Sequence, residues 1–368
     1  MPPTRVAVIG AGAFGRNHLR VYRELEQSDP NLVQLAALVE PDATRRDQFA
    51  NLYNVPTFAS VPQLLEANLS IDAASICVPT THHATVADQL LRANLDILIE
   101  KPFAATLAEA DNIIALAQHH SRIVAIGHLE RFNPAVTATL AALNKPMFFE
   151  AHRLSIFTPR SLDVDVVLDL MIHDLDIVLS LTNSPMKEVR AVGLPILSRK
   201  TDIANVRLEF ESGCVANFTA SRVSTEQVRK LRLFQPHQYL SLDFARQELL
   251  TISVDPAAIA AAIAAGSPLP AANSAAPTTP AVTETAQSHT PAGSPKPADV
   301  QHPTAGLNLT KAGISKGEPL RLELEDFLNS IQTRTQPRVT AEAGRAALAL
   351  ALEINAQIAA HAQRAGLA

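Results

Sequence analysis

The chain has 368 residues, which is enough for two domains, and 47% of its residues are hydrophobic. A net charge of −5 without a run of Lys or Arg excludes the basic surface typical of nucleic-acid binding, and no apolar stretch reaches the roughly 20 residues that span a bilayer. The two cysteines cannot form a disulfide framework, which favours a reducing compartment. Together with the net charge and the lack of a long apolar stretch, this predicts a cytoplasmic protein that binds neither nucleic acid nor a membrane.

The first predicted strand, Val6–Ile9, runs directly into a glycine-rich turn and then into a helix-forming segment. In the spacing Gly10-x-Gly12-x-x-Gly15, the first glycine allows a tight turn, the second lets the backbone approach a pyrophosphate, and the third lets the helix pack closely. The N-terminus of that helix offers free N–H groups to phosphates, so the pattern predicts a bound dinucleotide. The predicted contact residues of the turn are Gly10, Gly12, Ala13, Phe14 and Gly15.

The first 126 residues alternate short apolar runs with helical patterns such as Thr85–Ala93 and Leu107–His119. The predicted strands are Val6–Ile9, Val33–Val39, Ala73–Val78, Asp96–Ile99 and Ile123–Ile126. Such alternation predicts a doubly wound parallel α/β sheet with helices on both faces. We therefore assign residues 1–126 to a Rossmann domain.

The choice of dinucleotide depends on Glu40, which ends the second predicted strand. A carboxylate at this place accepts hydrogen bonds from the adenosine ribose and repels a 2′-phosphate, which favours NAD. Arg45 and Arg46 follow closely and could pair with a 2′-phosphate, so NADP stays open. Glu40 could also be a solvated loop residue.

Two further strand ends carry polar residues, and ligands of open α/β sheets bind beyond the carboxyl ends of the strands. His83 follows Val78-Pro79-Thr80, where it either approaches the cofactor or caps the next helix. Lys101 follows Glu100, where it is either an acid/base group or part of a surface ion pair. The predicted cofactor contacts at these strand ends are Pro79, Thr80, His83, Glu100 and Lys101.

After Asn133-Pro134 the pattern changes to strands with a period of two. The predicted elements are helix Ala135–Leu143, strand Met147–Leu154, helix Val166–Leu181, strands Glu188–Val192, Ile203–Phe210, Val215–Ser221, Lys230–Phe234 and Tyr239–Asp243, and helices Pro319–Ser330 and Ala341–Ala360. They predict a second domain, residues 127–254 and 316–368, with a mixed or antiparallel sheet open on one face. Because an open sheet usually needs a cover, we expect the protein to self-associate.

The segment between the two parts of this domain is rich in Ala and Pro. Nine of the 25 prolines lie between Pro256 and Pro303, with almost no aromatic residues. Such a composition buries too little apolar surface to offset chain entropy. We therefore predict a disordered insert at residues 255–315.

Asp169 and His173 lie four residues apart, which places both on one face of the predicted helix. His173 could exchange a proton with a substrate hydroxyl while Asp169 orients the substrate or the imidazole. Alternatively, His173 is a satisfied core or helix-surface residue. No third ligand lies at a spacing that indicates a metal site.

The segment Gly127–Pro134 joins the two predicted domains, which is a usual place for a ligand cleft. Arginines that follow it, Arg153 and Arg160, could bind phosphate in bidentate fashion, although Arg160 fits a solvated surface charge better. The predicted substrate contacts are His128, Arg131, Asn133, His152, Arg153 and Asp169.

Together these motifs resemble the glucose–fructose oxidoreductase/inositol dehydrogenase family, Gfo/Idh/MocA. The matching segments are Val8–Gly15, Val78–His83, Glu100–Pro102, Gly127–Pro134 and Asp169–His173. The resemblance implies a Rossmann domain, an α/β domain with a large, open, mainly antiparallel sheet used for dimer or tetramer contacts, and oxidation or reduction of a secondary alcohol on a sugar, cyclitol or sugar nucleotide. It also implies that Lys101, followed by a usually cis proline, acts with Asp169 and His173, and that Lys101 or His173 is the base.

Longer segments, such as EAHRLSIFTPR and RKLRLFQ, resemble a subgroup, the bacterial UDP-N-acetylglucosamine 3-dehydrogenases. That resemblance implies NAD-dependent oxidation of the sugar's 3-hydroxyl, which prepares a 3-amino sugar for lipid A. It makes His152, Arg153, Arg222 and Lys230 candidates for contacts with the diphosphate or the acetamido sugar. Two alternatives stay open: a dehydrogenase of a free sugar or inositol, and an NAD-sensing regulatory protein without turnover.

Overall fold

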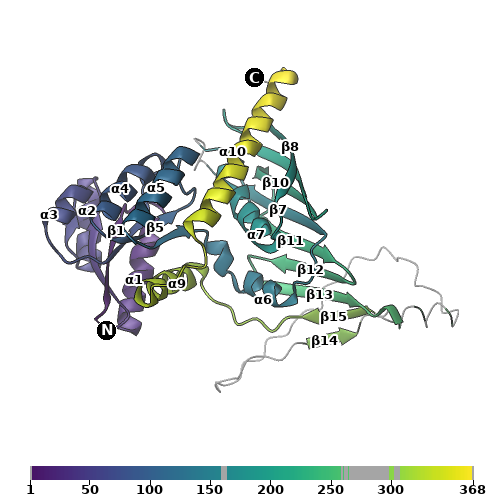
Figure 1. Ribbon diagram of the computed structural model, residues 1–368, viewed down its shortest axis with the longest axis horizontal. Helices are drawn as coiled ribbons and strands as arrows, with labels where there is room; N and C mark the ends of the chain where they lie inside the picture. Colours follow the sequence, from purple (N-terminus) through teal and green to yellow (C-terminus); the bar gives the residue numbers. More distant parts are fainter. Residues whose placement is uncertain are drawn as a thin grey trace.

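The computed structural model describes residues 2–158, 164–257, 260, 264, 298–301 and 307–366. They form a parallel sheet and a larger, mainly antiparallel sheet, with a long C-terminal helix between them (Figure 1). The expected α/β fold class is therefore confirmed. Within these residues, every helix is too short or too polar to cross a membrane.

The first sheet has six parallel strands, as the alternating pattern predicts. In spatial order they are β3 (Thr57–Phe58), β2 (Val33–Val39), β1 (Thr4–Ile9), β4 (Ala73–Ile76), β5 (Asp96–Glu100) and β6 (Val124–Gly127). The helices between them are α1 (Gly15–Ser28), α2 (Ala43–Tyr53), α3 (Val61–Glu66), the 3₁₀-helix η1 (Thr80–His82), α4 (His83–Arg92) and α5 (Leu107–His119). This strand order is that of a doubly wound dinucleotide-binding fold, whose ligand lies at the carboxyl ends of the strands.

Local sequence explains several boundaries in this domain. Strand β5 buries all five of its residues, which accounts for its uninterrupted apolar run. Helix α5 begins after Thr106, which forms a reciprocal capping box with Glu109. Helix α2 ends at Asn54, whose left-handed φ of 47° stops the helix.

Helix α9 (Pro319–Thr333) packs on the first domain, beside α1 (Figure 1). Its buried Leu320, Leu324 and Phe327 share one apolar core with side chains of β1 and α1. The expected assignment of residues 316–368 to the second domain is therefore wrong for α9. Periodicity predicts the helix and its apolar face, but it does not say which sheet receives that face.

The second sheet, as far as the described residues extend, has nine strands and is antiparallel except where β7 pairs with β10. In spatial order the strands are β14 (Ala298–Gln301), β15 (Leu307–Lys311), β13 (Glu248–Val254), β12 (Gln238–Asp243), β11 (Val228–Gln235), β7 (Phe148–Ile156), β10 (Val215–Ser224), β9 (Ile203–Phe210) and β8 (Met186–Leu194). Helices α6 (Pro134–Ala142), α7 (Ile172–Thr182) and α10 (Ala341–Arg364) cover one face. The other face carries no helix of the described chain, and we call it the open face (Figure 1).

Two strands lie within the expected disordered insert. Strand β15 pairs antiparallel with β13, and β14 pairs with β15. The expectation of disorder for residues 255–315 is therefore wrong at these strands, because backbone hydrogen bonds at a free sheet edge order a chain whatever its composition. Residues 258–259, 261–263, 265–297 and 302–306 of this insert lie outside the described residues.

Helix α10 belongs to both hydrophobic cores. Leu348 packs in the core of the first domain, and Ile354 packs in the core of the second. Gly344 lets the helix approach β6, because a Cβ at this position would lie 2.7 Å from Cγ1 of Ile126. One continuous helix therefore fixes the two domains relative to each other.

Replacing Leu324 by alanine tests whether α9 belongs to the first domain's core. Leu324 is fully buried, so Leu324→Ala should lower the free energy of unfolding by about 2–5 kcal/mol in a urea titration. The control is Leu322→Ala, because Leu322 lies on the same helix but is exposed. Equal effects of the two changes would contradict this packing.

Candidate active site

The glycine-rich turn after β1 has the backbone geometry that its spacing predicts. Gly10 has a φ of +95°, and a Cβ there would lie 2.9 Å from the carbonyl oxygen of Cys77. A Cβ on Gly15 would lie 1.9 Å from the carbonyl oxygen of Gly10, so only glycine fits where α1 begins. Gly12 differs, because nothing lies within 4 Å of a Cβ built on it. It therefore leaves open space beside the N-terminus of α1.

This space at Gly12 belongs to a cavity of about 320 Å³. Its lining residues are Ala11, Gly12, Ala13, Arg16, Arg45, Gln48 and Phe49. Ala13 and Phe14 are exposed on the turn. The N–H groups at the start of α1, together with Arg16 and Arg45, favour an anion, so the residues present fit the phosphates of a dinucleotide.

The Glu40 carboxylate turns back onto the glycine-rich turn. Its Oε2 accepts the N–H of Ala11 at 2.8 Å, and its Oε1 accepts the N–H of Asp42 at 3.0 Å. Arg45 contacts the same carboxylate at 3.4 Å, and Arg46 donates to the Glu40 carbonyl oxygen at 2.9 Å. Glu40 thus stabilises the turn beside the expected ribose position, while two arginines next to it leave the choice between NAD and NADP open.

The His83 ring joins two loops at the carboxyl edge of the first sheet. Its two ring nitrogens lie 3.0 Å from the carbonyl oxygens of Val78 and Pro102, and the residue is 1% exposed. Burial lowers the pKa of His83. The expectation that His83 contacts the cofactor is corrected: the ring holds the ends of β4 and β5 together. Pro79 and Thr80 lie in the loop that it supports.

Glu100 ends β5 and is buried against α1. Its Oε1 lies 2.8 Å from Nε2 of His18, and a Cβ on Gly127 would lie 2.9 Å from its carboxyl carbon. Such close packing fixes the side chain inside the protein. Glu100 therefore supports the site by linking α1 to β5, rather than by contacting a ligand as expected.

The next residue, Lys101, connects the two domains. Its peptide bond to Pro102 is cis, as the resemblance implies. Its Nζ donates to the carbonyl oxygen of Asp169 at 2.6 Å and lies 3.4 Å from the Asp169 Oδ1. The two side chains are 17% and 31% exposed, so a ligand can reach both. Lys101 therefore forms an ion pair where the domains meet.

Asp169 and His173 lie on a helix that starts irregularly. The predicted helix Val166–Leu181 begins instead with a π-helix, η3 (Val167–Met171), and continues as α7 from Ile172. Asp165 accepts the backbone N–H groups of Val167 and Leu168 at 2.9 and 3.0 Å. A π-helical turn is frequent at functional sites. Here it carries the Asp169 carboxylate that contacts Lys101.

His173 lies half-buried beside a second histidine, His128. The ring centroids are 6.2 Å apart and the rings are nearly perpendicular. Burial, followed by the charge of Lys101, lowers the pKa of His173 well below its ordinary value. Within the described residues, Nδ1 of His173 and both nitrogens of His128 are buried without a hydrogen-bond partner. At neutral pH both rings are therefore uncharged, and His173 is able to accept a proton.

Arg153 does not have the role that the sequence predicts. Its guanidinium is buried, and it donates to Asp174 at 2.9 and 2.7 Å and to Glu130 at 3.0 Å. These two carboxylates hold its pKa above the ordinary value despite burial. Because its hydrogen bonds go to Asp174 and Glu130, Arg153 joins β7 to the helices and is corrected from a substrate contact to a structural residue.

Two of the other basic candidates are placed away from the junction, whereas Arg222 lines a pocket beside Asp169. His152 and Lys230 lie opposite each other on β7 and β11, at positions that alternate with covered Ala151 and Leu231, so both are on the open face. Arg222 is buried and contacts Asp202 and the carbonyl oxygen of Val164. The expected substrate contacts of His152 and Lys230 are therefore wrong, because a shift of one residue along a strand changes the face. Arg160 lies outside the described residues.

Two residues of the joining segment have structural partners. Asn133 is buried, accepts the N–H of Ala135 at the start of α6, and donates to the Phe244 carbonyl oxygen at 3.0 Å. Arg131 lies 3.5 Å from Asp176 of α7. The expected substrate contact of Asn133 is therefore corrected to a helix cap.

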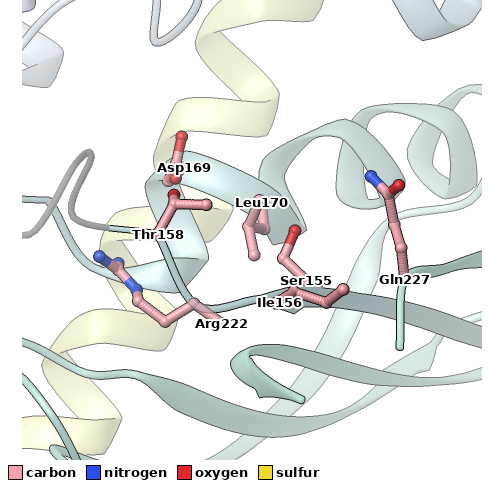
Figure 2. Close-up of a pocket in the computed structure, with 7 residues that line it drawn as sticks. All are labelled: Ser155, Ile156, Thr158, Asp169, Leu170, Arg222 and Gln227. Carbon is pink, nitrogen blue, oxygen red and sulfur yellow. The ribbon is translucent and has the colours of Figure 1, made fainter. Parts of the chain in front are cut away.

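A pocket of about 260 Å³ opens beside Asp169 (Figure 2). Its lining residues are Ser155, Ile156, Thr158, Asp169, Leu170, Arg222 and Gln227. Ser155, Thr158 and Gln227 are not among the residues that the sequence motifs predict for the site. Ser155 could have been found from its alternation with Arg153 along β7, but Thr158 and Gln227 lie outside the strands and carry no local signal. A wall of hydroxyl groups with a carboxylate, an amide and the Arg222 guanidinium suits a polar substrate.

The cavity at Gly12 and the Lys101–Asp169 pair beside His173 are the features of a dinucleotide-dependent oxidoreductase. Comparison with known families agrees: residues 4–128 match an oxidoreductase family with an NAD-binding Rossmann fold, and residues 137–235 match the Gfo/Idh/MocA C-terminal domain. The chain belongs to the Gfo/Idh/MocA family, as its motifs predict.

Relatives of this chain include named dehydrogenases. A UDP-N-acetylglucosamine 3-dehydrogenase of Acidithiobacillus ferrooxidans is 34% identical over 98% of this chain and 99% of its own length. A solved structure of that enzyme from the same organism has a TM-score of 0.79 and covers 98% of this chain and 99% of its own. An inositol 2-dehydrogenase of Leifsonia xyli subsp. xyli is 29% identical over 56% of this chain and 60% of its own. The expectation of an oxidoreductase that acts on CH–OH groups is confirmed.

The buried, uncharged His128 predicts a loss of stability in acid. Burial lowers its pKa below 6.5, so below that pH the unfolded chain binds a proton that the folded protein does not. The free energy of unfolding should therefore fall as the pH falls below 6.5, and His128 alone accounts for up to about 1.4 kcal/mol per pH unit. In urea titrations from pH 7.5 to 5, His128→Gln should show a shallower fall than the unchanged protein; parallel curves would contradict a neutral His128.

Proposed function

We propose that this protein oxidises the 3-hydroxyl of UDP-N-acetylglucosamine with NAD, the step that prepares a 3-amino sugar for lipid A. The observation that carries the proposal is the Lys101–Asp169 pair, which brings the cofactor domain against a polar pocket beside uncharged His173. Similarity over nearly the whole chain to a UDP-N-acetylglucosamine 3-dehydrogenase supports the substrate.

Oxidation of the alcohol removes two hydrogens, the proton of the hydroxyl group and the hydride of the carbinol carbon. A bound nicotinamide would supply the acceptor for the hydride that leaves the carbinol carbon. Lys101 holds the substrate hydroxyl by donating a hydrogen bond to it, in addition to the hydrogen bond that its ammonium group donates to the Asp169 carbonyl oxygen. His173 takes the hydroxyl proton at Nε2, which requires that Nδ1 carry the ring's own proton.

The preference for NAD rests on Glu40. Its buried carboxylate lies at the end of β2, where it repels a 2′-phosphate and accepts from the ribose hydroxyls. Arg45 contacts that carboxylate at 3.4 Å, so its charge is already partly compensated.

The test is NADH formation with a panel of alcohols. The panel contains UDP-N-acetylglucosamine, UDP-glucose, myo-inositol and glucose, each with NAD and with NADP and with a scavenger of the ketone product. Turnover of UDP-N-acetylglucosamine with NAD supports the proposal. Turnover of myo-inositol alone would replace it by a polyol dehydrogenase, and tight NAD binding without any turnover would favour a sensor.

On the active substrate, His173→Gln should lower kcat by about 10²–10⁴, the usual contribution of a general base. The affinity for NADH, measured by its fluorescence, should stay unchanged, because the variant keeps the glycine-rich turn. Lys145→Met, at an exposed lysine outside the site, serves as the control. An unchanged kcat in His173→Gln would reject His173 as the base.

We also propose that a second copy of the chain covers the open face. Phe148, Phe234 and Tyr239 form an aromatic cluster with ring-centroid distances of 5.5 and 4.9 Å, and Phe234 is 37% exposed. Val192 and Leu194 are exposed on either side of Gly193, which packs towards Ile358 of α10, so they face the same side as the aromatic cluster. An apolar face of this kind is typical of an interface.

Phe234→Asp should convert the dimer or tetramer to a smaller species, because it places a charge in the covered apolar surface. Light scattering coupled to gel filtration measures the mass. The control is Leu52→Asp, at an exposed leucine of α2 in the first domain, far from the open face of the second sheet. Equal masses of the two variants would show that the contact lies elsewhere.

A further inference from the structure

Of the cations expected at the phosphates of the proposed substrate, only Arg222 lines the pocket beside Asp169. Arg153 and Arg222 are buried in contacts with carboxylates, and His152 and Lys230 lie on the open face. Arg229, directly before Lys230, lies on the covered face instead, because it alternates with buried Leu231 and Leu233.

Arg229 lies directly opposite Arg153 across the β7–β11 pair. Like charges at such positions repel each other and destabilise a sheet. Arg153 is compensated by Asp174 and Glu130, whereas no hydrogen bond or ion pair is found for the Arg229 guanidinium within the described residues. Packing alone gives no reason for a second arginine here.

The free protein does not fully stabilise this charge. Arg229 is half-buried, and burial, followed by repulsion from Arg153, lowers its pKa. Glu130 and Asp174 act in the opposite direction, but both are engaged with Arg153. An anion that approached Arg229 would therefore gain a strong, charge-assisted hydrogen bond.

Arg229 is placed at the substrate end of the site. Its strand partner Arg153 binds Asp174, which directly follows the proposed base His173 in the chain. Gln227, two residues earlier in the chain, lines the pocket beside Asp169 (Figure 2). A nucleotide sugar carries its phosphate on the same pyranose ring as the reacting hydroxyl, so a cation next to the base is where that phosphate requires it.

We propose that Arg229 binds the diphosphate of the nucleotide sugar and thereby selects it over an unphosphorylated sugar. The inference rests on the proposed function and names the residue that recognises the substrate's phosphates. A bidentate guanidinium contact fits a diphosphate better than an ammonium group does.

The experiment compares Arg229→Gln with Lys230→Gln. The two variants remove one positive charge from adjacent residues on opposite faces of the same strand. UDP is titrated by calorimetry into protein saturated with NADH, so that the dinucleotide site is occupied. Arg229→Gln should weaken UDP binding by about tenfold or more and raise KM for UDP-N-acetylglucosamine similarly, whereas Lys230→Gln should change neither.

Arg229→Lys keeps the charge and should restore part of the affinity for UDP, while unchanged NADH binding shows that each variant is folded. Equal UDP affinity in Arg229→Gln and the unchanged protein would overturn the inference. If the unchanged protein turns over UDP-N-acetylglucosamine and only this comparison fails, the proposed function stands without Arg229. If the unchanged protein neither binds UDP nor turns over the nucleotide sugar, the proposed function fails, and the inference fails with it.

Discussion

A buried positive charge determines how the second domain is assembled. The Arg153 guanidinium on β7 is compensated by Glu130 from the segment that joins the domains and by Asp174 from α7. Removing one partner of a buried ion pair typically costs about 3–5 kcal/mol, so these three elements hold one arrangement. Since His173 directly precedes Asp174, the same pairing fixes the proposed base where the domains meet. The side chain that we propose as the base is thus positioned by an interaction that takes no part in the proposed chemistry.

The two domains meet in a fixed way because α10 is shared between them. The helix packs Leu348 into one core and Ile354 into the other, and Gly344 allows close contact with β6. Such packing leaves little freedom for the domains to separate. The contact between Lys101 and Asp169 can therefore form without a large closing motion, and the dinucleotide turn and the polar pocket lie on the two sides of that contact.

Side chains alternate between the two faces along each strand, and this alternation decides which basic residues can reach a substrate. On β7 and β11, the covered positions carry Arg153 and Arg229, and the open positions carry His152 and Lys230. The segment RKLRLFQ shows that basic residues gather here, but neighbouring residues point to opposite faces. The open face suits contacts with another chain, and the covered face suits the substrate, so the one sheet serves both purposes.

The sequence by itself determined the parallel first domain, the glycine-rich turn and the second strand-rich domain, because these depend on local periodicity and short motifs. Its resemblance to a family named Lys101, Asp169 and His173 as candidates, of which the structure joins Lys101 to Asp169. The tertiary structure decided what depends on contacts between distant residues. It placed α9 on the first sheet, ordered β15 at a free strand edge, and paired Arg153 with buried carboxylates. Helical periodicity shows which face of α9 is apolar but not its partner, and a basic residue in a strand does not reveal which face it occupies, since that depends on register with neighbouring strands.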